Sequence, residues 1–456
     1  MAKLIENLLL TDIHSAGKAI GQHQGKNIFV PFGIPGETVN VLLDRRQRGF
    51  YSGTIEDIKL ASDKRIQPFC RHYGICGGCN WQHMDYQEQL RLKRQILLNA
   101  LRKYKIETPE IPQVVPSDDL YFFRNKVEYA FEAIGYDGVT NEEIRNCLGY
   151  HPIEVRNRVI NIEECRLQRE PSRKICEAVK RIAIKNDIPF YHYPDRSGLL
   201  RNVIIRTSTT GETLAILGFT TNDPEKITML LKQLKDEVPE ISSLCCTILT
   251  DSEKGYMDGE IVNFYGTGYL SEQMGEIGFR ISPKAFFQPN PKQAQKIYGK
   301  VLKYLEPKGN ELVYDLYTGA GTIACFVASK VRSVIGVEGS ADAIHDAGLN
   351  ARLNNLQNTR FICGDVLQTF TADFVEAYGK PDVVILDPPR AGTLIEIKKT
   401  IIKAAPSKII YVSCNPVSLA FDLTMLTNGY RVSQIQPYDM FPHTHHVETV
   451  VLLEKQ

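Results

Sequence analysis

Two motifs in the last part of the chain carry side chains that can make and break covalent bonds. Ser413-Cys414-Asn415-Pro416 places a thiol at the end of an apolar run, followed by an Asn-Pro turn. Glu448 begins a second apolar run, which continues through Val450 and Leu452. A thiolate is a nucleophile and a carboxylate can accept a proton. The motifs therefore predict Cys414 as a nucleophile and Glu448 as a general base.

Each of these residues also has a plainer interpretation. Cysteine is a common small residue of protein cores, and a glutamate at the start of a strand can simply face solvent. Residues 443–448 also contain three histidines before the glutamate, a composition typical of a metal site. In an extended chain, however, the side chains at 443 and 445 point to the opposite face from those at 446 and 448, so we expect no metal ion there.

A third group of residues has the spacing of a nucleoside pocket. An apolar run ends in Asp315-Leu316-Tyr317-Thr318-Gly319-Ala320-Gly321, where glycines allow a tight turn and a close ligand. Glu338 follows the next run, where a carboxylate can accept both ribose hydroxyls, and acidic residues follow two later runs at Asp365 and Asp387. Carboxylates suit a nucleoside with a positive charge better than a diphosphate, so we expect S-adenosylmethionine. The plainer interpretation is that these residues only cap helices and turns.

The motif Asp387-Pro388-Pro389-Arg390 indicates which atom accepts the methyl group. Methyltransferases that act on amino groups usually have an aromatic residue after the two prolines, where it stacks on the base. Arginine at this position argues against methylation of a nitrogen atom and leaves a carbon atom as the expected acceptor of the methyl group. Carbon 5 of a pyrimidine becomes nucleophilic when a thiolate adds to carbon 6, and a base must later remove its proton. Cys414 and Glu448 are the two groups that this chemistry needs.

A separate set of cysteines, Cys70, Cys76 and Cys79, lies in a segment with two glycines early in the chain. Cysteines this close predict a metal or cluster pocket, although they can also be ordinary core residues. Their spacing does not separate zinc from an iron–sulfur cluster. The nearest candidates for a fourth ligand are Cys147, Cys165 and Cys176.

The elements that must position these groups fall into three parts. Residues 1–65 have short apolar stretches between glycine turns, which predict a small OB-like β-barrel. Residues 66–280 mix strands with a few helices, a mixed α+β part, and the clearest helix is about 86–105, which we expect to pack on the part from 281 to 456. From 281 to 456, strands and helices alternate, which predicts an α/β, Rossmann-like, doubly wound and mostly parallel sheet whose last two strands are antiparallel. We expect the helix to present its basic residues to solvent: Arg91, Lys93, Arg94, Arg102 and Lys103.

Composition excludes several classes of protein. The chain has 456 residues, 43% of them hydrophobic and 23% charged, values typical of a globular protein with a full core. No apolar run approaches the length of about 18 residues that a membrane-spanning helix needs. The apolar stretch at the start of the chain is too short for a secretory signal, so we expect a cytoplasmic protein. A formal charge of +1 does not by itself indicate nucleic-acid binding, and an odd number of cysteines, 11, argues against a disulfide framework.

The motifs together resemble those of the bacterial RNA (uracil-C5)-methyltransferases, and especially the ribosomal RNA branch that carries a TRAM domain and an iron–sulfur cluster. The resemblance covers nearly the whole chain. It rests on Phe286-Phe287-Gln288-Pro289-Asn290, on Ser413-Cys414-Asn415-Pro416 as the nucleophile motif and on His446-Val447-Glu448 as the base motif. One position differs, because some relatives have Asn where this chain has Thr322.

The resemblance implies roles for individual residues. Gln288 contacts the cofactor, Phe286 helps to hold the flipped base, and Arg124 lies in a segment near the substrate, Tyr121–Lys126. The resemblance implies that Tyr317, Glu338, Asp365 and Asp387 line the cofactor pocket, together with Gly319 and Gly321 of the glycine turn. The cysteine pocket holds a 4Fe–4S cluster with a structural or RNA-binding role, since methyl transfer requires no electrons, and its ligands are Cys70, Cys76, Cys79 and Cys165.

The resemblance also implies an RNA substrate. The barrel resembles a TRAM domain, which binds RNA by stacking and positive charge, with candidate contacts at Lys18, Lys26, Arg45, Arg46, Arg48, Phe50 and Tyr51. The target uridine must be flipped out to be reached. We expect a monomer, without a membrane partner, that methylates uridine in 23S ribosomal RNA. The alternatives are the same reaction on transfer RNA, whose dedicated enzymes generally lack the barrel and the cysteines, cytosine C5-methylation, and a non-catalytic RNA-binding factor in ribosome assembly.

Overall fold

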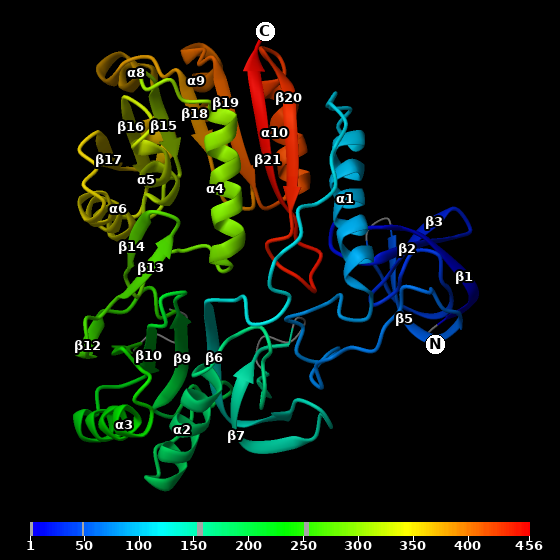
Figure 1. The fold of residues 1–456 in the computed structure, drawn as a ribbon. Coiled ribbons are helices and arrows are strands. Elements are labelled where there is room, and N and C mark those ends of the chain that lie inside the picture. Colours follow the sequence, from blue (N-terminus) through cyan, green and yellow to red (C-terminus); the bar gives the residue numbers. More distant parts are fainter. Residues whose placement is uncertain (1–2, 48–49, 153–157, 250–254) are drawn as a thin grey trace.

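Three β-structures follow one another along the chain: a barrel, a central sheet and a C-terminal sheet flanked by helices (Figure 1). This computed structural model describes residues 3–47, 50–152, 158–249 and 255–456. The barrel and the central sheet lie at the same end of the C-terminal sheet, and helix α1 (Tyr86–Lys103) stands between the barrel and that sheet. Segments from all three parts therefore meet near one edge of the C-terminal sheet.

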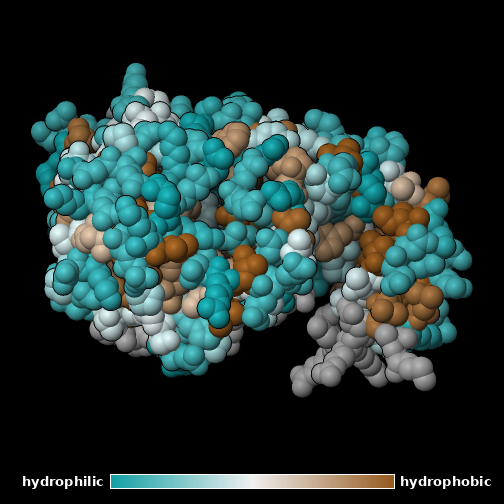
Figure 2. All heavy atoms as spheres, turned by 90° about the horizontal axis from the view of Figure 1, so that it is seen from below, coloured by the Kyte–Doolittle hydropathy of each residue, from teal (hydrophilic) through white to brown (hydrophobic). Residues whose placement is uncertain are grey.

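The N-terminal part is a closed barrel with the strand order β1-β2-β3-β5-β4, as its glycine-punctuated pattern predicts. The strands are β1 (Leu4–Ile13), β2 (Ala19–His23), β3 (Lys26–Val30), β4 (Thr38–Gln47) and β5 (Phe50–Leu60). Strands β3 and β5 pair in parallel and close the barrel. Figure 2 shows hydrophobic residues gathered over the barrel on the right of the view, and the large hydrophobic residues that the barrel exposes include Leu4, Leu9, Phe32 and Leu60. The side chains of Arg45, Arg46, Arg48 and Phe50, expected to contact RNA, lie outside the described part of the structure.

Helix α1 connects the barrel to the C-terminal sheet through two apolar contacts. Leu92 and Ile96 pack with Trp81 and with apolar residues of the barrel. The next apolar residues of the helix, Leu97, Ala100 and Leu101, enter the core on one face of the C-terminal sheet, beside helix α10 (Pro416–Leu426). The helix therefore fixes where the barrel lies relative to that sheet.

The central part is a sheet covered by two helices. Its strands, in the order β12-β11-β10-β9-β6-β7-β8, are β6 (Lys126–Asp137), β7 (Glu143–Tyr150), β8 (Ile160–Asn161), β9 (Leu200–Thr207), β10 (Thr213–Phe219), β11 (Ser243–Ile248) and β12 (Ile261–Tyr265). Helices α2 (Ser172–Lys185) and α3 (Pro224–Glu237) pack on it with their apolar sides. A hairpin, β13 (Leu270–Met274) and β14 (Ile277–Ile281), contributes to a core that residues of the central sheet share with the C-terminal part.

The C-terminal part is the doubly wound sheet that the alternation of strands and helices predicts. Its strand order is β17-β16-β15-β18-β19-β21-β20, with β15 to β19 parallel and the last two strands antiparallel. The strands are β15 (Leu312–Leu316), β16 (Ser333–Glu338), β17 (Thr359–Cys363), β18 (Val383–Leu386), β19 (Lys408–Ser413), β20 (Tyr430–Tyr438) and β21 (Glu448–Lys455). Apart from α10, the helices are α4 (Pro291–Leu305), α5 (Thr322–Ala328), α6 (Ala341–Leu353), α7 (Val366–Thr369), α8 (Ala372–Tyr378) and α9 (Ile395–Ala404).

The two faces of this sheet bury different helices. Helices α4, α5 and α6 contribute to the core on one face, and α7 to α10, together with α1, contribute to the core on the other. Both faces being covered explains the continuous apolar runs of the parallel strands. Among the helices of the described ranges, none is both long enough and apolar enough to cross a membrane.

Candidate active site

The predicted nucleophile, base and cofactor residues come together at one edge of the C-terminal sheet. The functional residues lie within two residues of the carboxyl ends of the parallel strands β15 to β19: Asp315, Tyr317, Glu338, Asp365, Asp387 and Cys414. Glu448 begins β21, which runs antiparallel to β19, so this residue lies at the same edge. Because Ser413 pairs with Thr449, the register places Cys414 and Glu448 side by side across two adjacent strands.

Cys414, Glu448 and Asp387 influence one another's protonation. Burial, followed by the negative charges of Glu448 and Asp387, raises the pKa of the Cys414 thiol to about 12, while Arg390 acts in the opposite direction. Burial and then Asp387 raise the pKa of Glu448 to about 8, opposed by Arg390 and Lys93. Burial and the neighbouring Asp315 raise the pKa of Asp387 to about 7. The site therefore holds closely spaced acidic groups that favour a positive charge among them.

The turn that carries Cys414 is fixed by its own motif. Ser413 Oγ accepts a hydrogen bond from Asn415 N at 3.2 Å, and the Asn415 side chain caps helix α10. Asn415 Nδ2 also donates to the carbonyl oxygen of Arg390 at 2.9 Å. The guanidinium of Arg390 lies 3.5 Å from His446 Nε2, in the segment that precedes Glu448. The nucleophile, the arginine and the base segment are thus connected.

The turn after β15 has the shape of a pocket wall. Tyr317, Gly319 and Gly321 all have positive φ angles, of 66°, 55° and 73°. Apart from its neighbours in the chain, no atom of the described residues lies within 4 Å of the place where a side chain of Gly319 would begin, so open space faces this glycine. Glu338 braces the turn, because its Oε2 accepts from Gly319 N at 3.2 Å and its Oε1 accepts from Ser340 N at 2.9 Å.

A buried ion pair supports Tyr317 from behind. The hydroxyl of Tyr317 lies 2.9 Å from Thr393 Oγ1, and Thr393 N donates to Asp422 Oδ2 at 2.8 Å. Asp422 also accepts from Tyr411 OH at 2.6 Å and from Lys398 Nζ at 2.5 Å. Both charged side chains of this pair are almost completely buried. The loop after Arg390 is therefore anchored at the wall of the predicted cofactor pocket.

Two other predicted carboxylates differ in their surroundings. Asp315 is buried, accepts from Thr318 Oγ1 at 2.5 Å, and burial raises its pKa to about 7. Asp365 Oδ1 accepts from Leu367 N at 2.9 Å and caps the short helix α7. The capping role is the plainer of the two interpretations that the sequence allows for Asp365.

The segment with Phe286 and Gln288 is held by the central sheet and by the loop between β20 and β21. Asn125 donates from its side chain to Gln288 O at 3.0 Å, and Asn290 Nδ2 donates to Met440 O at 3.3 Å. Phe286 is 68% exposed, which leaves its ring available to a ligand. Arg124 precedes Asn125 and donates from Nε to Lys126 O at 3.0 Å.

The predicted cluster cysteines line one cavity of about 410 Å³. Cys70, Cys76 and Cys79 come from the segment before α1, and Cys165 follows β8 in the central part. Burial is the main cause that raises the pKa of Cys70, and it raises those of Cys76 and Cys79 to about 12, with the neighbouring thiols adding to the effect. Arg124 lies in the wall of the same cavity.

The other candidates for a fourth ligand lie elsewhere. Cys147 is buried in a small core with Ala130 and Val159, and Cys176 faces a second cavity that it shares with Cys165. Within the described ranges, no group of three or more His, Cys, Asp or Glu side chains is close enough to hold a single metal ion. The cysteine cavity is therefore not pre-formed as a compact single-ion site.

The three histidines before Glu448 have protein partners. His443 Nε2 donates to Leu120 O at 3.0 Å, and Asn80 Nδ2 lies 2.8 Å from His445 Nδ1. Burial lowers the pKa of His443 and of His445 to about 4, and that of His446 to about 3. All three rings are therefore neutral at physiological pH and serve to hold the base segment.

The expectation that the basic residues of α1 face solvent is wrong for Lys93. Its side chain is completely buried and forms an ion pair with Asp439, next to the base segment. A lysine in a basic run gives no sign of burial by itself. The only signal in the sequence is its spacing from Tyr86 and Gln89, which places the three on one helix face.

Comparison with known proteins relates this geometry to one kind of enzyme. The family described as tRNA (Uracil-5-)-methyltransferase matches residues 264–456. An uncharacterized RNA methyltransferase of Bacteroides thetaiotaomicron is 40% identical over 96% of this chain and 99% of its own length. One of Porphyromonas gingivalis is 39% identical over 97% of this chain and 98% of its own length.

A solved structure is similar over the full length. The chain resembles the Pyrococcus abyssi tRNA (uracil-54, C5)-methyltransferase in complex with S-adenosyl-L-homocysteine, with 26% identity and a TM-score of 0.77. The match covers 98% of this chain and 100% of that one, so it includes the barrel and the central part as well as the C-terminal sheet.

Proposed function

Because this chain belongs to the RNA uracil-5-methyltransferase family, we propose that it transfers the methyl group of S-adenosylmethionine to carbon 5 of a uridine in RNA, through a covalent bond between Cys414 and carbon 6. One observation carries this proposal: Cys414 and Glu448 are neighbours on adjacent strands at the edge where the pocket residues also lie. A nucleophile, a base and a pocket for the methyl donor are the three parts that the reaction needs.

The proposed reaction has three steps: addition of the thiolate, methyl transfer and proton removal. The Cys414 thiol first loses its proton to solvent. The thiolate then adds to carbon 6, and the electron pair of the 5,6 double bond moves to carbon 5 and the carbonyl at carbon 4. Carbon 5 takes the methyl group as its bond to sulfur breaks, which releases S-adenosylhomocysteine. Glu448 then removes the proton from carbon 5, the double bond re-forms and the bond between Cys414 and carbon 6 breaks. A base with a pKa of about 8 is suited to this step, because it lies near the operating pH.

The electrostatics of the site support a cationic methyl donor. Asp387, Glu448 and Asp315 all have raised pKa values, so a positive charge brought among them would be stabilised and would lower those values. The open space at Gly319, braced by Glu338, suits the close approach of a nucleoside. We assign Tyr317, Gly319, Gly321, Glu338, Asp365, Asp387 and Gln288 to this ligand, and Phe286 and Arg124 to the RNA.

We further propose that Cys70, Cys76, Cys79 and Cys165 hold a 4Fe–4S cluster. The four side chains line one cavity of about 410 Å³, a fit that supports the assignment. A cubane cluster is wider than one metal ion, so its thiolate ligands need not converge on a single point. The iron–sulfur bonds would join the segment before α1 to the central part, and no step of the methyl transfer passes through them.

Two RNA substrates remain in competition. The sequence resemblance implies 23S ribosomal RNA, an expectation based on the barrel and the cysteines. Transfer RNA is favoured by a different observation: a tRNA (uracil-54, C5)-methyltransferase matches this chain along 100% of its own length, so the same three-part architecture occurs in a tRNA enzyme. We propose 23S ribosomal RNA as the substrate and transfer RNA as the alternative.

Nucleoside mapping tests the proposal. We expect 5-methyluridine to disappear from 23S ribosomal RNA in a strain that lacks the protein, and to return when the wild-type gene, but not one encoding Cys414→Ala, is restored. Loss of 5-methyluridine from transfer RNA alone would establish the alternative. An unchanged nucleoside content in both RNAs would contradict the proposed function.

A further inference from the structure

A polar stripe on helix α1 faces the protein interior. Tyr86, Gln89 and Lys93 are spaced by three and four residues, which places them on one face of the helix. Gln89 is 1% exposed and Lys93 is completely buried. Burying an ammonium group is costly unless it is paired, so this stripe needs a partner of matching chemistry.

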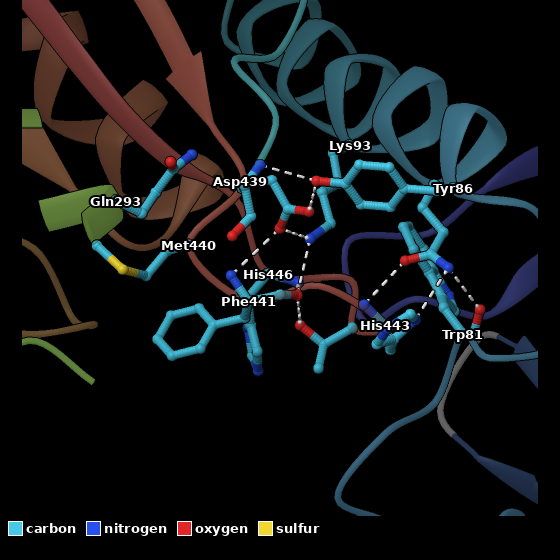
Figure 3. A network of polar contacts seen from close by, with 12 residues as sticks. Trp81, Tyr86, Lys93, Gln293, Asp439, Met440, Phe441, His443 and His446 are labelled. Atoms are coloured by element: carbon cyan, nitrogen blue, oxygen red, sulfur yellow. Dashed lines mark hydrogen bonds and ion pairs between the residues drawn. The ribbon is translucent and has the colours of Figure 1, made fainter. Parts of the chain in front are cut away.

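The partner is the loop between β20 and β21. Lys93 Nζ forms an ion pair with Asp439 Oδ1 and donates to Phe441 O at 2.9 Å, while Tyr86 OH donates to Asp439 Oδ2 at 2.8 Å (Figure 3). Gln89 Oε1 accepts from His443 N at 2.8 Å. Every member of the stripe therefore contacts the same loop, more than 300 residues away in the sequence.

The loop depends on these contacts for its shape. Residues 439–447 contain no helix or strand. His443 has a φ of 66°, a backbone conformation that residues other than glycine rarely adopt. Such a backbone conformation persists only where contacts with the surrounding residues hold it in place. Here the carbonyl of His443 accepts from Asn80 N at 3.1 Å and from Trp81 N at 3.0 Å, in addition to the contact with Gln89.

Glu448 follows this loop directly. We propose that Tyr86, Gln89 and Lys93 are positioning residues for the general base: they hold the loop so that Glu448 is directed towards Cys414, and they act on proton removal rather than on binding of the methyl donor. This inference rests on the proposed function, since it assumes the role of Glu448 as base.

The charges around Glu448 agree with this arrangement. Asp387 raises its pKa, Arg390 and Lys93 lower it, and Cys414 and Tyr298 are the other titratable groups that interact with it. Lys93 is the one member of this set that comes from the N-terminal half of the chain. Helix α1 thus contributes both contacts and charge to the base segment.

The chain offers a matched control. Lys398 and Asp422 form a second fully buried lysine–aspartate pair, but this pair supports Thr393 and Tyr317 at the cofactor wall. Lys93→Met and Lys398→Met remove the same group from the same kind of environment. The pair of Lys93 and Asp439 supports the segment that carries the base, whereas the pair of Lys398 and Asp422 supports the wall of the cofactor pocket.

The experiment follows one turnover of wild-type and variant proteins on unmodified transcripts of 23S ribosomal RNA and of transfer RNA, with the methyl group of S-adenosylmethionine radiolabelled. Denaturing gels measure the labelled protein–RNA adduct, and nucleoside analysis measures free 5-methyluridine. Calorimetry measures the affinity for S-adenosylhomocysteine, and thermal melting checks folding.

We expect Lys93→Met to slow resolution of the methylated adduct by about tenfold or more, a cost typical of a misplaced catalytic group. The adduct then accumulates while the rate of methyl transfer and the affinity for S-adenosylhomocysteine stay near wild type. Lys93→Met combined with Asp439→Asn, which removes both charges, is expected to accumulate adduct as well. Lys398→Met is expected to weaken S-adenosylhomocysteine binding and to resolve its adduct at the wild-type rate.

Tyr86→Phe keeps the inference testable if Lys93→Met does not fold, because it removes one hydroxyl and one hydrogen bond. Slower resolution in Tyr86→Phe supports the inference. The inference is overturned if every folded variant of Tyr86, Gln89 or Lys93 resolves the adduct at the wild-type rate. It is also overturned if Lys93→Met and Lys398→Met reduce methyl transfer, adduct resolution and S-adenosylhomocysteine affinity equally. Failure of the proposed function is distinct, because in that case the wild-type protein itself forms no adduct and no 5-methyluridine on either RNA.

Discussion

Cys414 and Glu448 keep their protons to a higher pH than free cysteine and glutamate side chains do. With pKa values of about 12 and about 8, the thiol keeps its proton at neutral pH, and the carboxyl group keeps it in most molecules. Both shifts are caused mainly by burial and are increased by Asp387. The arrangement links reactivity to the binding of a positively charged ligand, since such a ligand offsets the negative charges that raise both pKa values.

The first prediction at the scale of residues separates the roles of these two side chains. Cys414→Ser should lose both the covalent adduct and 5-methyluridine, because a serine hydroxyl is a far weaker nucleophile than a thiolate. Glu448→Gln should form the methylated adduct but resolve it slowly, by a factor of about 100 or more, since the glutamine side chain cannot accept the proton. Denaturing gels with radiolabelled methyl donor measure both effects. Rapid product release by Glu448→Gln would exclude this residue as the base.

The second prediction concerns stability of the ligand-free protein between pH 6.5 and 8. Asp315, Asp387 and Glu448 have folded pKa values of about 7, 7 and 8, above the ordinary values of 3.8, 3.8 and 4.5. A carboxyl group with a raised pKa stabilises the folded state at low pH, and that stability is lost as the pH rises through the folded pKa, by up to about 1.4 kcal/mol per pH unit for each group.

Buried histidines act in the opposite direction, but at lower pH. His443, His445 and His446 have pKa values lowered to between about 3 and 4, so their contribution is lost as the pH falls below 6.5. The free energy of unfolding should therefore decrease from pH 6.5 to 8, and Asp387→Asn should make that decrease smaller. Denaturant titrations at several pH values measure both. An equal slope in wild type and Asp387→Asn would contradict the pKa assigned to Asp387.

At the scale of elements, the turn between β15 and α5 offers two glycines with the same backbone requirement and different surroundings. Both have positive φ angles, so alanine is strained at either position. A Cβ at Gly321 would lie 2.9 Å from Ala347 Cβ and 3.1 Å from Phe361 Cζ. One at Gly319 would meet no atom within 4 Å in the described ranges, its neighbours in the chain aside.

The third prediction follows from this difference. Gly321→Ala should lower the melting temperature more than Gly319→Ala, because it adds a steric clash to the backbone strain of about 1 kcal/mol. Gly319→Ala should instead weaken binding of S-adenosylhomocysteine, since its methyl group occupies the space where we place the ligand. Thermal melting and calorimetry on the same two variants separate the effects. A Gly319→Ala variant with unchanged ligand affinity would place the ligand elsewhere.

At the scale of the whole molecule, segments from all three parts meet at the loop between β20 and β21. The barrel contributes Gly17, whose carbonyl accepts from Trp81 Nε1 at 2.9 Å and whose Cα lies against His445. The segment before α1 contributes Asn80 and Trp81, and the central part contributes Leu120. The base segment is therefore built from contacts that no single part of the chain could supply.

The fourth prediction belongs to this scale, because the cysteine cavity also joins two parts of the chain. Cys76→Ser should lose most of the iron and acid-labile sulfide that we expect in protein purified without air. Cys176→Ser is the matched control: it lies near Cys165 but outside the lining of the cavity, and it should keep the full iron content. Metal analysis and the visible absorption spectrum measure the outcome. Zinc in place of iron, or equal loss in both variants, would contradict the cluster assignment.

The sequence by itself determined the barrel, the doubly wound sheet and the edge at which its functional motifs meet. That much can be read from short segments, because alternating strands and helices form a parallel sheet and their carboxyl ends lie together. The positions of Cys414, Asp387 and the turn at Gly319 follow from this rule. Glu448 follows from the same rule only with the added fact that β21 is antiparallel to its neighbour β19.

Only the tertiary structure decided which side chains surround those motifs. Lys93 belongs to a basic helical run that is expected to face solvent, yet it is buried against Asp439. Cys165, and neither Cys147 nor Cys176, lines the cavity of the early cysteines. The hairpin β13–β14 shares one core with residues of both the central and the C-terminal parts. The physical reason is common to all three: burial and charge pairing depend on contacts between residues far apart in the chain, and local spacing carries no information about such contacts.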